Sequence, residues 1–277
     1  MDKNKIEEIE IDLLIDAIFR RYGYDFHQYA RASLKRRIWG GFEHSGMEYI
    51  SQMISKILYD PEFFNLFFIH LSVNVTEMFR NPEFYLSLKK NIVPYLKTYP
   101  FVKIWVAGCA TGEEVYSLAI LLKEVEFYDK CLIYATDFND EVLEKAKEGI
   151  YSIEHIKEYT SNYHSAGGTR SFGEYFHSDH ANVIFDRKLK ENIVFASHNL
   201  VTDDSFGEMN LVLCRNVLIY FTRELQNRVF RLFEKSLCHN GFLCLGRSET
   251  LKLSVVANQF HTIDEHEKIF QKKQVDE

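Results

Sequence analysis

Between residues 103 and 114 the chain reads Lys103-Ile-Trp-Val-Ala-Gly108-Cys-Ala-Thr-Gly112-Glu113-Glu114, an apolar run that enters a glycine-rich turn, and a helical pattern follows. Such a strand, turn and helix let a ligand approach the backbone closely at the carboxyl edge of a parallel sheet. The spacing is not the Gly-x-Gly-x-x-Gly of dinucleotide sites, and Glu113 and Glu114 lie where a pyrophosphate would meet the helix. A cofactor without phosphate is therefore favoured. The alternative is an ordinary turn whose acids complement the helix dipole.

A further acidic residue ends the next apolar run, Leu132-Ile-Tyr-Ala-Thr-Asp137, 25 residues after Gly112. In a doubly wound sheet, a carboxylate at this position accepts hydrogen bonds from ribose hydroxyls. Its alternative role is to cap the following helix, which Asp140 would serve equally well. A ligand that contains ribose but no phosphate points to S-adenosylmethionine.

Beyond about residue 100, short β-type runs alternate with helical patterns, which predicts a parallel sheet with crossover helices. The segment 151–192 is too long for a simple crossover and predicts an inserted subdomain, partly helical and partly strand or loop. The expected strands are 102–106, 131–136, 193–196, 211–214 and 242–245, the expected helices are 114–125, 140–147 and 223–237, and a closing hairpin is expected at 260–263 and 268–270.

The first seventy residues predict a helical unit. Apolar residues recur at helical spacing in the first helix and form one expected stripe, with acidic residues between them. A second helix, 26–39, is expected to stop at Gly40-Gly41, and two more are expected at 47–58 and 62–71. The predicted domains are thus 1–72, helical, and 73–277, the sheet domain with its insertion. The stripe consists of Ile6, Ile9, Leu13, Leu14, Ala17 and Ile18.

Composition excludes several classes of protein. The chain has 277 residues, 46% of them hydrophobic, and four prolines, which excludes disordered and low-complexity classes. A net charge of −7 argues against nucleic acid or anionic membrane as default partners. The apolar runs fall short of the about 20 residues that span a bilayer, and no secretory h-region is visible. Five cysteines without a CxxC pair suggest buried thiols, so a cytoplasmic protein without a structural zinc site is expected.

Further polar residues follow the later strands or precede the sheet. Asn199 and Leu200 follow the third expected strand, and Asn199 is a candidate for the adenine edge or, alternatively, for a turn. Arg215, Asn216 and Tyr220 follow the fourth strand and are expected to face the substrate. Ahead of the sheet lie Asn74, Thr76 and Arg80, for which helix capping and a simple ion pair are the alternatives.

Together these residues resemble the chemotaxis receptor methyltransferases, the CheR family of protein-glutamate O-methyltransferases. The resemblance covers nearly the whole chain in ordered blocks, and Met78 and Val115 depart from the residues usual in the family. The blocks are Lys35-Arg-Arg37, Asn74-x-Thr76-x-x-Phe79-Arg80, Ala107-Gly-Cys-Ala-Thr-Gly-Glu-Glu114, Ala135-Thr-Asp137, His198-Asn-Leu200, Cys214-Arg-Asn-Val-Leu-Ile-Tyr-Phe221 and Gly241-Phe-Leu-Cys-Leu-Gly-Arg-Ser-Glu249.

The resemblance implies a class I S-adenosylmethionine-dependent methyltransferase, with a Rossmann-like α/β sheet and a small all-helical N-terminal domain. It implies transfer of the methyl group to receptor glutamates for sensory adaptation, with S-adenosylhomocysteine as the product. Arg80 and Tyr220 would lie nearest the methyl. The implied cofactor residues are Asn74, Thr76, Arg80, Gly108, Glu113, Asp137, Asn199, Leu200, Arg215 and Asn216.

A basic segment suggests how a receptor would bind. Residues 20–37 contain six basic residues and one acidic residue. A stripe formed by Arg31, Lys35, Arg36 and Arg37 would meet an acidic helical receptor. A solvated helix face is the alternative. We expect a monomer that binds the cytoplasmic helical part of a receptor, without nucleic acid or membrane insertion.

Other functions remain open at this stage. One is a methyltransferase for a small molecule or for another signalling protein, and another is a module that binds the cofactor without transferring the methyl group. A nicotinamide oxidoreductase is disfavoured because the glycine spacing and Glu113 oppose pyrophosphate. The insertion is not expected to carry the receptor-tether site of some relatives, and His177 and His180 are expected to be surface residues rather than metal ligands.

Overall fold

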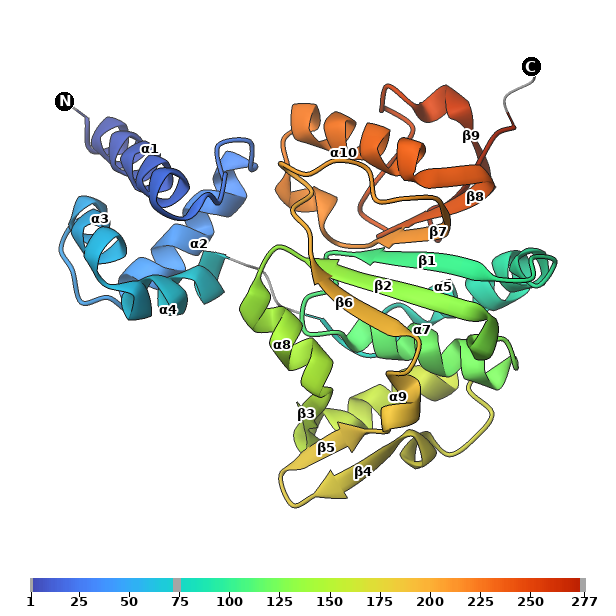
Figure 1. Cartoon of the computed structure of the whole chain (residues 1–277). Coiled ribbons are helices and arrows are strands. Elements are labelled where there is room, and N and C mark those ends of the chain that lie inside the picture. Colours follow the sequence, from blue (N-terminus) through green and yellow to red (C-terminus); the bar gives the residue numbers. More distant parts are fainter. Residues whose placement is uncertain (1, 72–75, 275–277) are drawn as a thin grey trace. The chain divides into compact units, whose positions relative to one another are not determined.

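The computed structural model describes residues 2–71 and 76–274 (Figure 1). The chain forms two compact units. One is a helical unit of Met1–Asn74 with Ile219–Gln226, and the other is a sheet unit of Val75–Leu218 with Asn227–Glu277. The sequence had placed 219–226 in the sheet domain. Among the described residues, no helix is long and apolar enough to cross a membrane.

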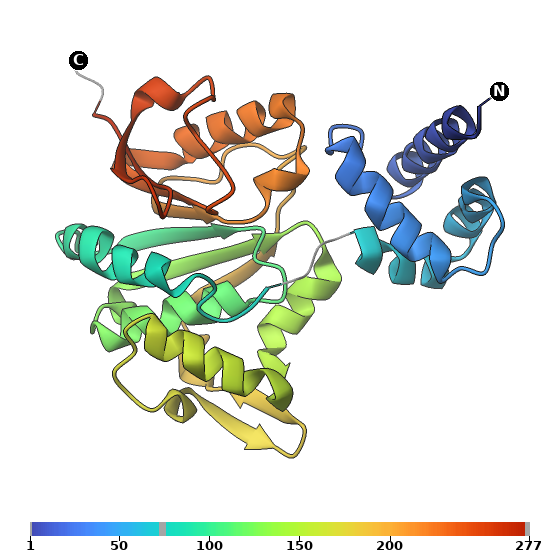
Figure 2. The same ribbon diagram turned by 180° about the vertical axis from the view of Figure 1, so that it is seen from behind.

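The helical unit contains α1 (Lys3–Tyr22), α2 (Arg31–Glu43), α3 (Ile50–Tyr59) and α4 (Pro61–Leu71) (Figure 2). All four helices were expected from the apolar periodicity. Their facing sides form one apolar core. Its buried members include Ile11, Leu14, Ile15, Ile18, Leu34, Ile38, Met53, Ile57, Phe64, Phe67 and Phe68.

Helix α1 is apolar on two faces, and the single stripe expected from the sequence was wrong. The core takes Ile11, Leu14, Ile15 and Ile18, which recur at the i, i+3, i+4, i+7 spacing of one helix face. On the other side Ile6, Ile9 and Leu13 are 42%, 46% and 52% exposed. Both sets fit helical spacing, so periodicity alone did not distinguish them.

Helix α2 continues through Gly40-Gly41 to Glu43, so the expected stop at this pair was wrong. Gly41 is a point of close approach. A Cβ atom there would lie 2.5 Å from Cδ2 of Phe67 in α4, whereas a Cβ at Gly40 would meet no atom within 4 Å. Gly41 therefore allows α2 to pack against an aromatic ring, a contact between distant parts of the sequence.

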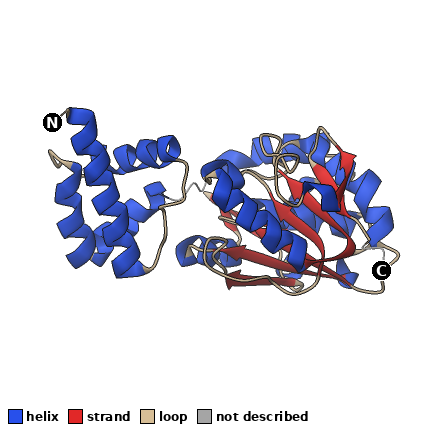
Figure 3. Ribbon diagram, turned by 90° about the horizontal axis from the view of Figure 1, so that it is seen from above, coloured by secondary structure: helices blue, strands red, loops and turns tan. Residues whose placement is uncertain are grey.

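The sheet unit is built on a seven-stranded sheet (Figure 3). Its first five strands in spatial order pair in parallel, and β10 runs antiparallel to both of its neighbours. This confirms the predicted α/β class, the five parallel strands and the closing hairpin. The spatial order is β6 (Ile193–Ser197), β2 (Cys131–Asp137), β1 (Val102–Ala107), β7 (Met209–Cys214), β8 (Leu237–Leu245), β10 (Ile269–Lys272) and β9 (Phe260–Asp264).

The strand order reverses between β1 and β7, which is where open α/β sheets bind ligands. The central helix α7 (Glu113–Glu124) is buried along most of its length, because it packs within the apolar core of this unit. Besides the helix of the insertion, the unit contains the α-helices α5 (Pro82–Ser87), α6 (Val93–Leu96), α8 (Asp140–Glu148) and α10 (Arg223–Ser236). The first turn of α10 belongs to the helical unit.

The insertion is partly helical and partly strand, as expected. It contains helix α9 (Ile156–Ser165) and a small antiparallel sheet in the order β3 (Ile150–Ser152), β5 (Asn182–Phe185), β4 (Phe176–Asp179). The Glu124 carboxylate at the end of α7 accepts hydrogen bonds from the hydroxyls of Tyr163 and Tyr175. The insertion is thus tied to the main body of the sheet unit.

The two neighbouring glycines of α2 provide a matched pair of variants. We expect Gly41→Ala to destabilise the protein by about 1–3 kcal/mol, because its methyl group would overlap the Phe67 ring. Gly40→Ala should stabilise it by about 0.5–1 kcal/mol, because alanine favours the helix and the site is open. Urea unfolding of both variants measures the difference, and equal effects would contradict the close-approach role of Gly41.

Candidate functional site

The turn between β1 and α7 has a backbone that only glycine adopts without strain at two positions. Gly108 has φ 74° and Gly112 has φ 93°. A Cβ atom on Gly108 would also lie 2.6 Å from Cγ2 of Val217. The turn is held in place because the Gly108 N–H donates to the Thr136 carbonyl at the end of β2. The glycine-rich turn thus lies at the carboxyl edge, where the sequence predicted it.

Two buried carboxylates lie beside this turn. Burial raises the pKa of Glu113 to about 7, although the Thr111 hydroxyl, which donates to Glu113 Oε2 at 2.7 Å, acts in the opposite direction. Burial also raises the pKa of Asp137, opposed by backbone N–H groups. Two of these donors are Ala110 and Asn139, each 3.0 Å from an Asp137 carboxylate oxygen. The backbone therefore fixes the orientation of Asp137.

This chemistry fits S-adenosylmethionine. Buried carboxylates accept hydrogen bonds from ribose hydroxyls and suit a positively charged ligand. The first turn of α7 carries Glu113 and Glu114, and acidic side chains at a helix N-terminus oppose a phosphate group. When bound, the cofactor would be held by residues of this turn and by the strand ends beside it.

The loop that carries Arg80 is held from three sides. Its Phe79 N–H donates to Ser117 Oγ of α7 at 2.8 Å, and Asn162 of α9 donates to the Met78 carbonyl at 3.1 Å. Phe79 and Asn81 both have positive φ, 53° and 57°, which is strained for residues other than glycine. Such a conformation persists only where its surroundings enforce it, so Arg80 is presented by a rigid loop.

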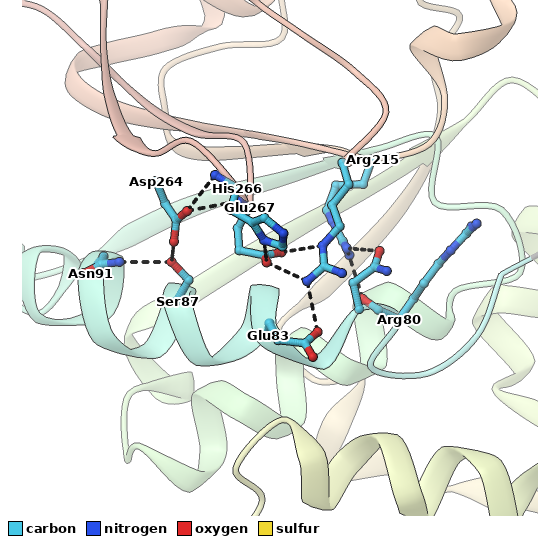
Figure 4. A network of polar contacts seen from close by, with 10 residues as sticks. Arg80, Glu83, Ser87, Asn91, Arg215, Asp264, His266 and Glu267 are labelled. Atoms are coloured by element: carbon cyan, nitrogen blue, oxygen red, sulfur yellow. Dashed lines mark hydrogen bonds and ion pairs between the residues drawn. The ribbon is translucent and has the colours of Figure 1, made fainter.

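The third support of the loop is Arg215, directly after β7 (Figure 4). Its guanidinium forms an ion pair with Glu114 and donates to the Arg80 carbonyl at 3.0 Å and to Asn81 Oδ1 at 3.1 Å. It also lies 4.0 Å from the centre of the Phe84 ring, and the side chain is 3% exposed. The Arg215 side chain thus binds other protein groups. Its assignment as a cofactor contact stays a prediction.

A second group of contacts holds helix α5, which follows the Arg80 loop (Figure 4). Ser87 donates to the Asp264 carboxylate in β9. Arg247 pairs with Glu83 of α5 and with Glu267 of the β9–β10 hairpin. These contacts fix α5 to the edge of the sheet. Arg80 lies on the opposite side of the drawn network from Ser87 and Asn91 (Figure 4).

Asn216 lies in a turn after β7 with a left-handed backbone, φ 62°, which asparagine tolerates better than most residues. The buried Glu249 carboxylate accepts from the backbone N–H groups of Asn216, Leu218 and Gly246 at 3.1, 2.7 and 2.6 Å. Three such donors satisfy the buried charge and join the loop after β7 to the loop after β8. Glu249 stood in a quoted sequence block, but its role was missed because its partners are backbone groups.

The remaining predicted cofactor residues have varied surroundings. Asn199 is half-buried, and its Oδ1 accepts from the Val201 N–H at 2.9 Å, which is the turn role that the sequence left open. Leu200 is buried and Thr76 is half-buried. Asn74 lies outside the described residues. All four stay predictions as cofactor contacts.

Tyr220 belongs to the helical unit rather than to the sheet unit. The Tyr220 carbonyl accepts from the Ala30 N–H at 2.8 Å, just before α2. Sequence order gave no indication of this, since Tyr220 follows a strand of the sheet. Its predicted role near the methyl group stays a prediction.

The predicted receptor-binding stripe is only partly exposed. Arg31 pairs with Glu8 and Asp12 of α1, and Lys35 pairs with Glu7. These acids offset much of the positive charge counted along the sequence.

Two adjacent arginines of the stripe differ in exposure. Arg36 is exposed. Arg37 is buried, so its assignment to a docking surface was wrong. The helical period places these neighbours on different faces of α2. The count of basic residues along the sequence did not distinguish the two faces.

Two further residues of the site were missed by the sequence. Glu114 was treated as an ordinary acid of the first helical turn, but it pairs with Arg215 on a distant strand end. Tyr151 of the insertion donates to the Thr111 carbonyl in the glycine-rich turn at 2.7 Å. Neither contact had a local signal in the sequence.

The fold and this carboxylate-lined turn define an S-adenosylmethionine-dependent methyltransferase. Family models support this class over nearly the whole chain. The model described as "CheR methyltransferase, SAM binding domain" matches residues 74–269, and "CheR methyltransferase, all-alpha domain" matches residues 9–72. The chain belongs to the CheR methyltransferase family, and its cofactor is S-adenosylmethionine.

Individual relatives share this similarity. A Pseudomonas putida protein with the provisional name methyltransferase Cher3 is 45% identical, over 98% of this chain and 100% of its own length. A Listeria monocytogenes chemotaxis protein methyltransferase is 28% identical, over 89% and 92% of the two chains. The Escherichia coli chemotaxis protein methyltransferase is 32% identical, over 65% and 62%.

The Arg215–Glu114 pair yields a prediction. Arg215→Met should leave the Glu114 carboxylate without its cation and destabilise the sheet unit by about 3–5 kcal/mol. Replacing both residues, as Arg215→Met with Glu114→Leu, should recover part of this loss. Urea unfolding measures the stabilities, and Lys252→Met, which removes an exposed pair with Glu265, is the control. A double variant as unstable as Arg215→Met alone would contradict the pairing.

Proposed function

We propose that this protein methylates glutamate side chains of chemotaxis receptors and forms glutamyl methyl esters. The observation that carries the proposal is the rigid loop that presents Arg80 within a family whose relatives are named chemotaxis protein methyltransferases. A guanidinium carried by a rigid loop is suited to a carboxylate substrate, because it can bind such a group with defined geometry.

The proposed cofactor site uses the turn and the strand ends. Glu113 and Asp137 accept hydrogen bonds from the ribose hydroxyls, and Gly108 contributes to the left-handed turn that lies beside the ligand. The remaining members proposed for this site are Asn74, Thr76, Arg80, Asn199, Leu200, Asn216 and the backbone of Arg215.

The transfer step requires little acid or base chemistry. The cofactor supplies a methyl group bonded to a positively charged sulfur. A glutamate with an ordinary pKa of about 4.3 is already ionised at neutral pH, so its carboxylate would need no base before it accepts the methyl group that the bound cofactor would supply. Arg80 and Tyr220 orient the carboxylate, and positioning provides most of the rate enhancement.

Receptor binding is proposed for the exposed part of α2. Arg36 is the most accessible member of the basic stripe, and Arg31 and Lys35 would exchange their α1 partners for receptor acids. We propose that the protein acts as a cytoplasmic monomer and binds an acidic helical segment of a receptor through these residues.

Transfer of a labelled methyl group tests the proposal. The protein is incubated with S-adenosylmethionine labelled in the methyl group and with receptor-containing membranes. We expect the label on receptor protein and its release as methanol by mild base, as a carboxyl ester requires. Label that resists base, or that appears only on small molecules, would overturn the proposed substrate and favour another methyltransferase activity.

Arg80 should be required for turnover. We expect Arg80→Ala to lower receptor methylation about 100-fold, because the carboxylate loses its orienting group. The affinity for S-adenosylhomocysteine should fall less than about tenfold. Arg187→Ala, in a short helix of the insertion, is the matched control. Normal turnover of Arg80→Ala with normal cofactor binding would exclude this role.

The raised pKa of Glu113 predicts a pH-dependent affinity. Ribose hydroxyls donate to the ionised carboxylate, so binding lowers the Glu113 pKa from its value of about 7 and releases a proton. Affinity for S-adenosylhomocysteine should therefore weaken about tenfold from about pH 8 to about pH 6. Calorimetry at both pH values measures this change. Glu113→Gln should bind more weakly and lose most of the pH dependence, and a variant that keeps the full dependence would contradict the assignment.

A further inference from the structure

Arg37 is a buried cation with several fixed partners inside the helical unit. It is 8% exposed and donates to the Leu71 carbonyl at the end of α4. It also donates to the Ser33 carbonyl at 3.3 Å and to Ser33 Oγ at 3.4 Å. Burying a guanidinium is costly unless its donors are satisfied, so these contacts hold the side chain in one position.

Two tyrosine rings lie against the Arg37 guanidinium. Its central carbon is 4.9 Å from the ring centre of Tyr220 and 5.5 Å from that of Tyr29. A cation near the face of an aromatic ring is attracted by the ring, more strongly where water is excluded. Burial lowers the pKa of Arg37, and the neighbouring Tyr29 and Tyr220 act in the opposite direction.

The backbone around Tyr220 is bonded to the same unit. The Ala30 N–H donates to the Tyr220 carbonyl at 2.8 Å, and the Thr222 N–H donates to the Gln28 carbonyl at 2.9 Å. Between these bonds, Tyr29 and Phe221 form an antiparallel bridge with ring centres 5.1 Å apart. The segment Ile219–Gln226 is thus held by the residues just before α2.

We propose that Arg37 is a positioning residue: from within the helical unit, it sets the orientation of the Tyr220 ring. This proposal rests on the proposed function, in which Tyr220 orients the substrate carboxylate. Arg37 contacts Leu71, close to the point where the chain leaves the helical unit. It also contacts Tyr220, close to the point where the chain returns to this unit. The helix proposed to bind the receptor through Arg36 therefore also holds a residue of the transfer step.

Adjacent arginines should then show opposite kinetic effects. Arg37→Gln loses the cation that faces Tyr220, so kcat should fall at least tenfold while KM for the receptor changes less than about threefold. Arg36→Gln removes an exposed cation, so KM should rise while kcat is kept. Lys56→Gln, an exposed variant of α3, is the control for general surface effects.

A double variant tests whether Arg37 acts through the tyrosine. If it does, adding Arg37→Gln to Tyr220→Phe should cost less than Arg37→Gln costs the native protein. Independent effects in the double variant, or a raised KM with unchanged kcat in Arg37→Gln, would overturn the proposal and leave Arg37 with a general structural role in the helical unit.

Hydrogen exchange provides a measurement that needs no substrate and so remains valid if receptor methylation fails. We expect Arg37→Gln to speed exchange at the Ala30 and Thr222 amides, while the core amides of α3 exchange as in the native protein. Should Arg37→Gln not fold, Tyr220→Leu, which removes the ring, should speed the same amides, and Tyr220→Phe, which keeps it, should not. Unchanged exchange in Arg37→Gln, or in Tyr220→Leu, would overturn the proposal.

Discussion

The ion pair between Glu114 and Arg215 connects the elements on which the site of the sheet unit depends. Glu114 lies in the first turn of α7, Arg215 follows β7, and the guanidinium reaches the backbone of the loop that carries Arg80. Desolvation makes a buried pair a poor source of net stability, since apolar residues of similar volume often stabilise as well. Its value here is geometric. The planar guanidinium has several donors in fixed directions, so it can bind a carboxylate, a carbonyl and an amide oxygen at once. A strained loop between Phe79 and Asn81 requires such support.

The sequence predicted the sheet well, because apolar runs of strand length and the turn at Gly108 and Gly112 are local features. It also placed Glu113 and Asp137 beside the glycine-rich turn, since the first opens the helix after that turn and the second ends the neighbouring strand. Predictions from the sequence were wrong or missing where contacts between distant segments determine the structure. Gly41 looked like a helix stop but accommodates the Phe67 ring. Leu13 looked like part of a core stripe but is exposed. The partners of Arg215, Glu249 and Arg37 come from distant segments, so no spacing rule along the chain could have found them.

Under the proposed function, the helical unit would have more than one role to fulfil with the same residues. Its acidic α1 residues neutralise Arg31 and Lys35, so the receptor binding proposed there would be an exchange of partners. Exposed ion pairs of this kind contribute little to stability, so such an exchange would cost little free energy. The basic character counted from the sequence therefore overstates the free positive surface, and the specificity of the proposed docking would depend on how well receptor acids compete with those of α1.

The crossing of Ile219–Gln226 into the helical unit has a consequence for evolution. A helical domain exchanged between two relatives at the single junction near residue 74 would arrive without the eight residues of Ile219–Gln226 that belong to its compact unit, and would have to accept those of the recipient. The segment and the residues just before α2 must therefore change together. Recombination at that junction is constrained, and the two halves of this enzyme are expected to have been inherited as one piece.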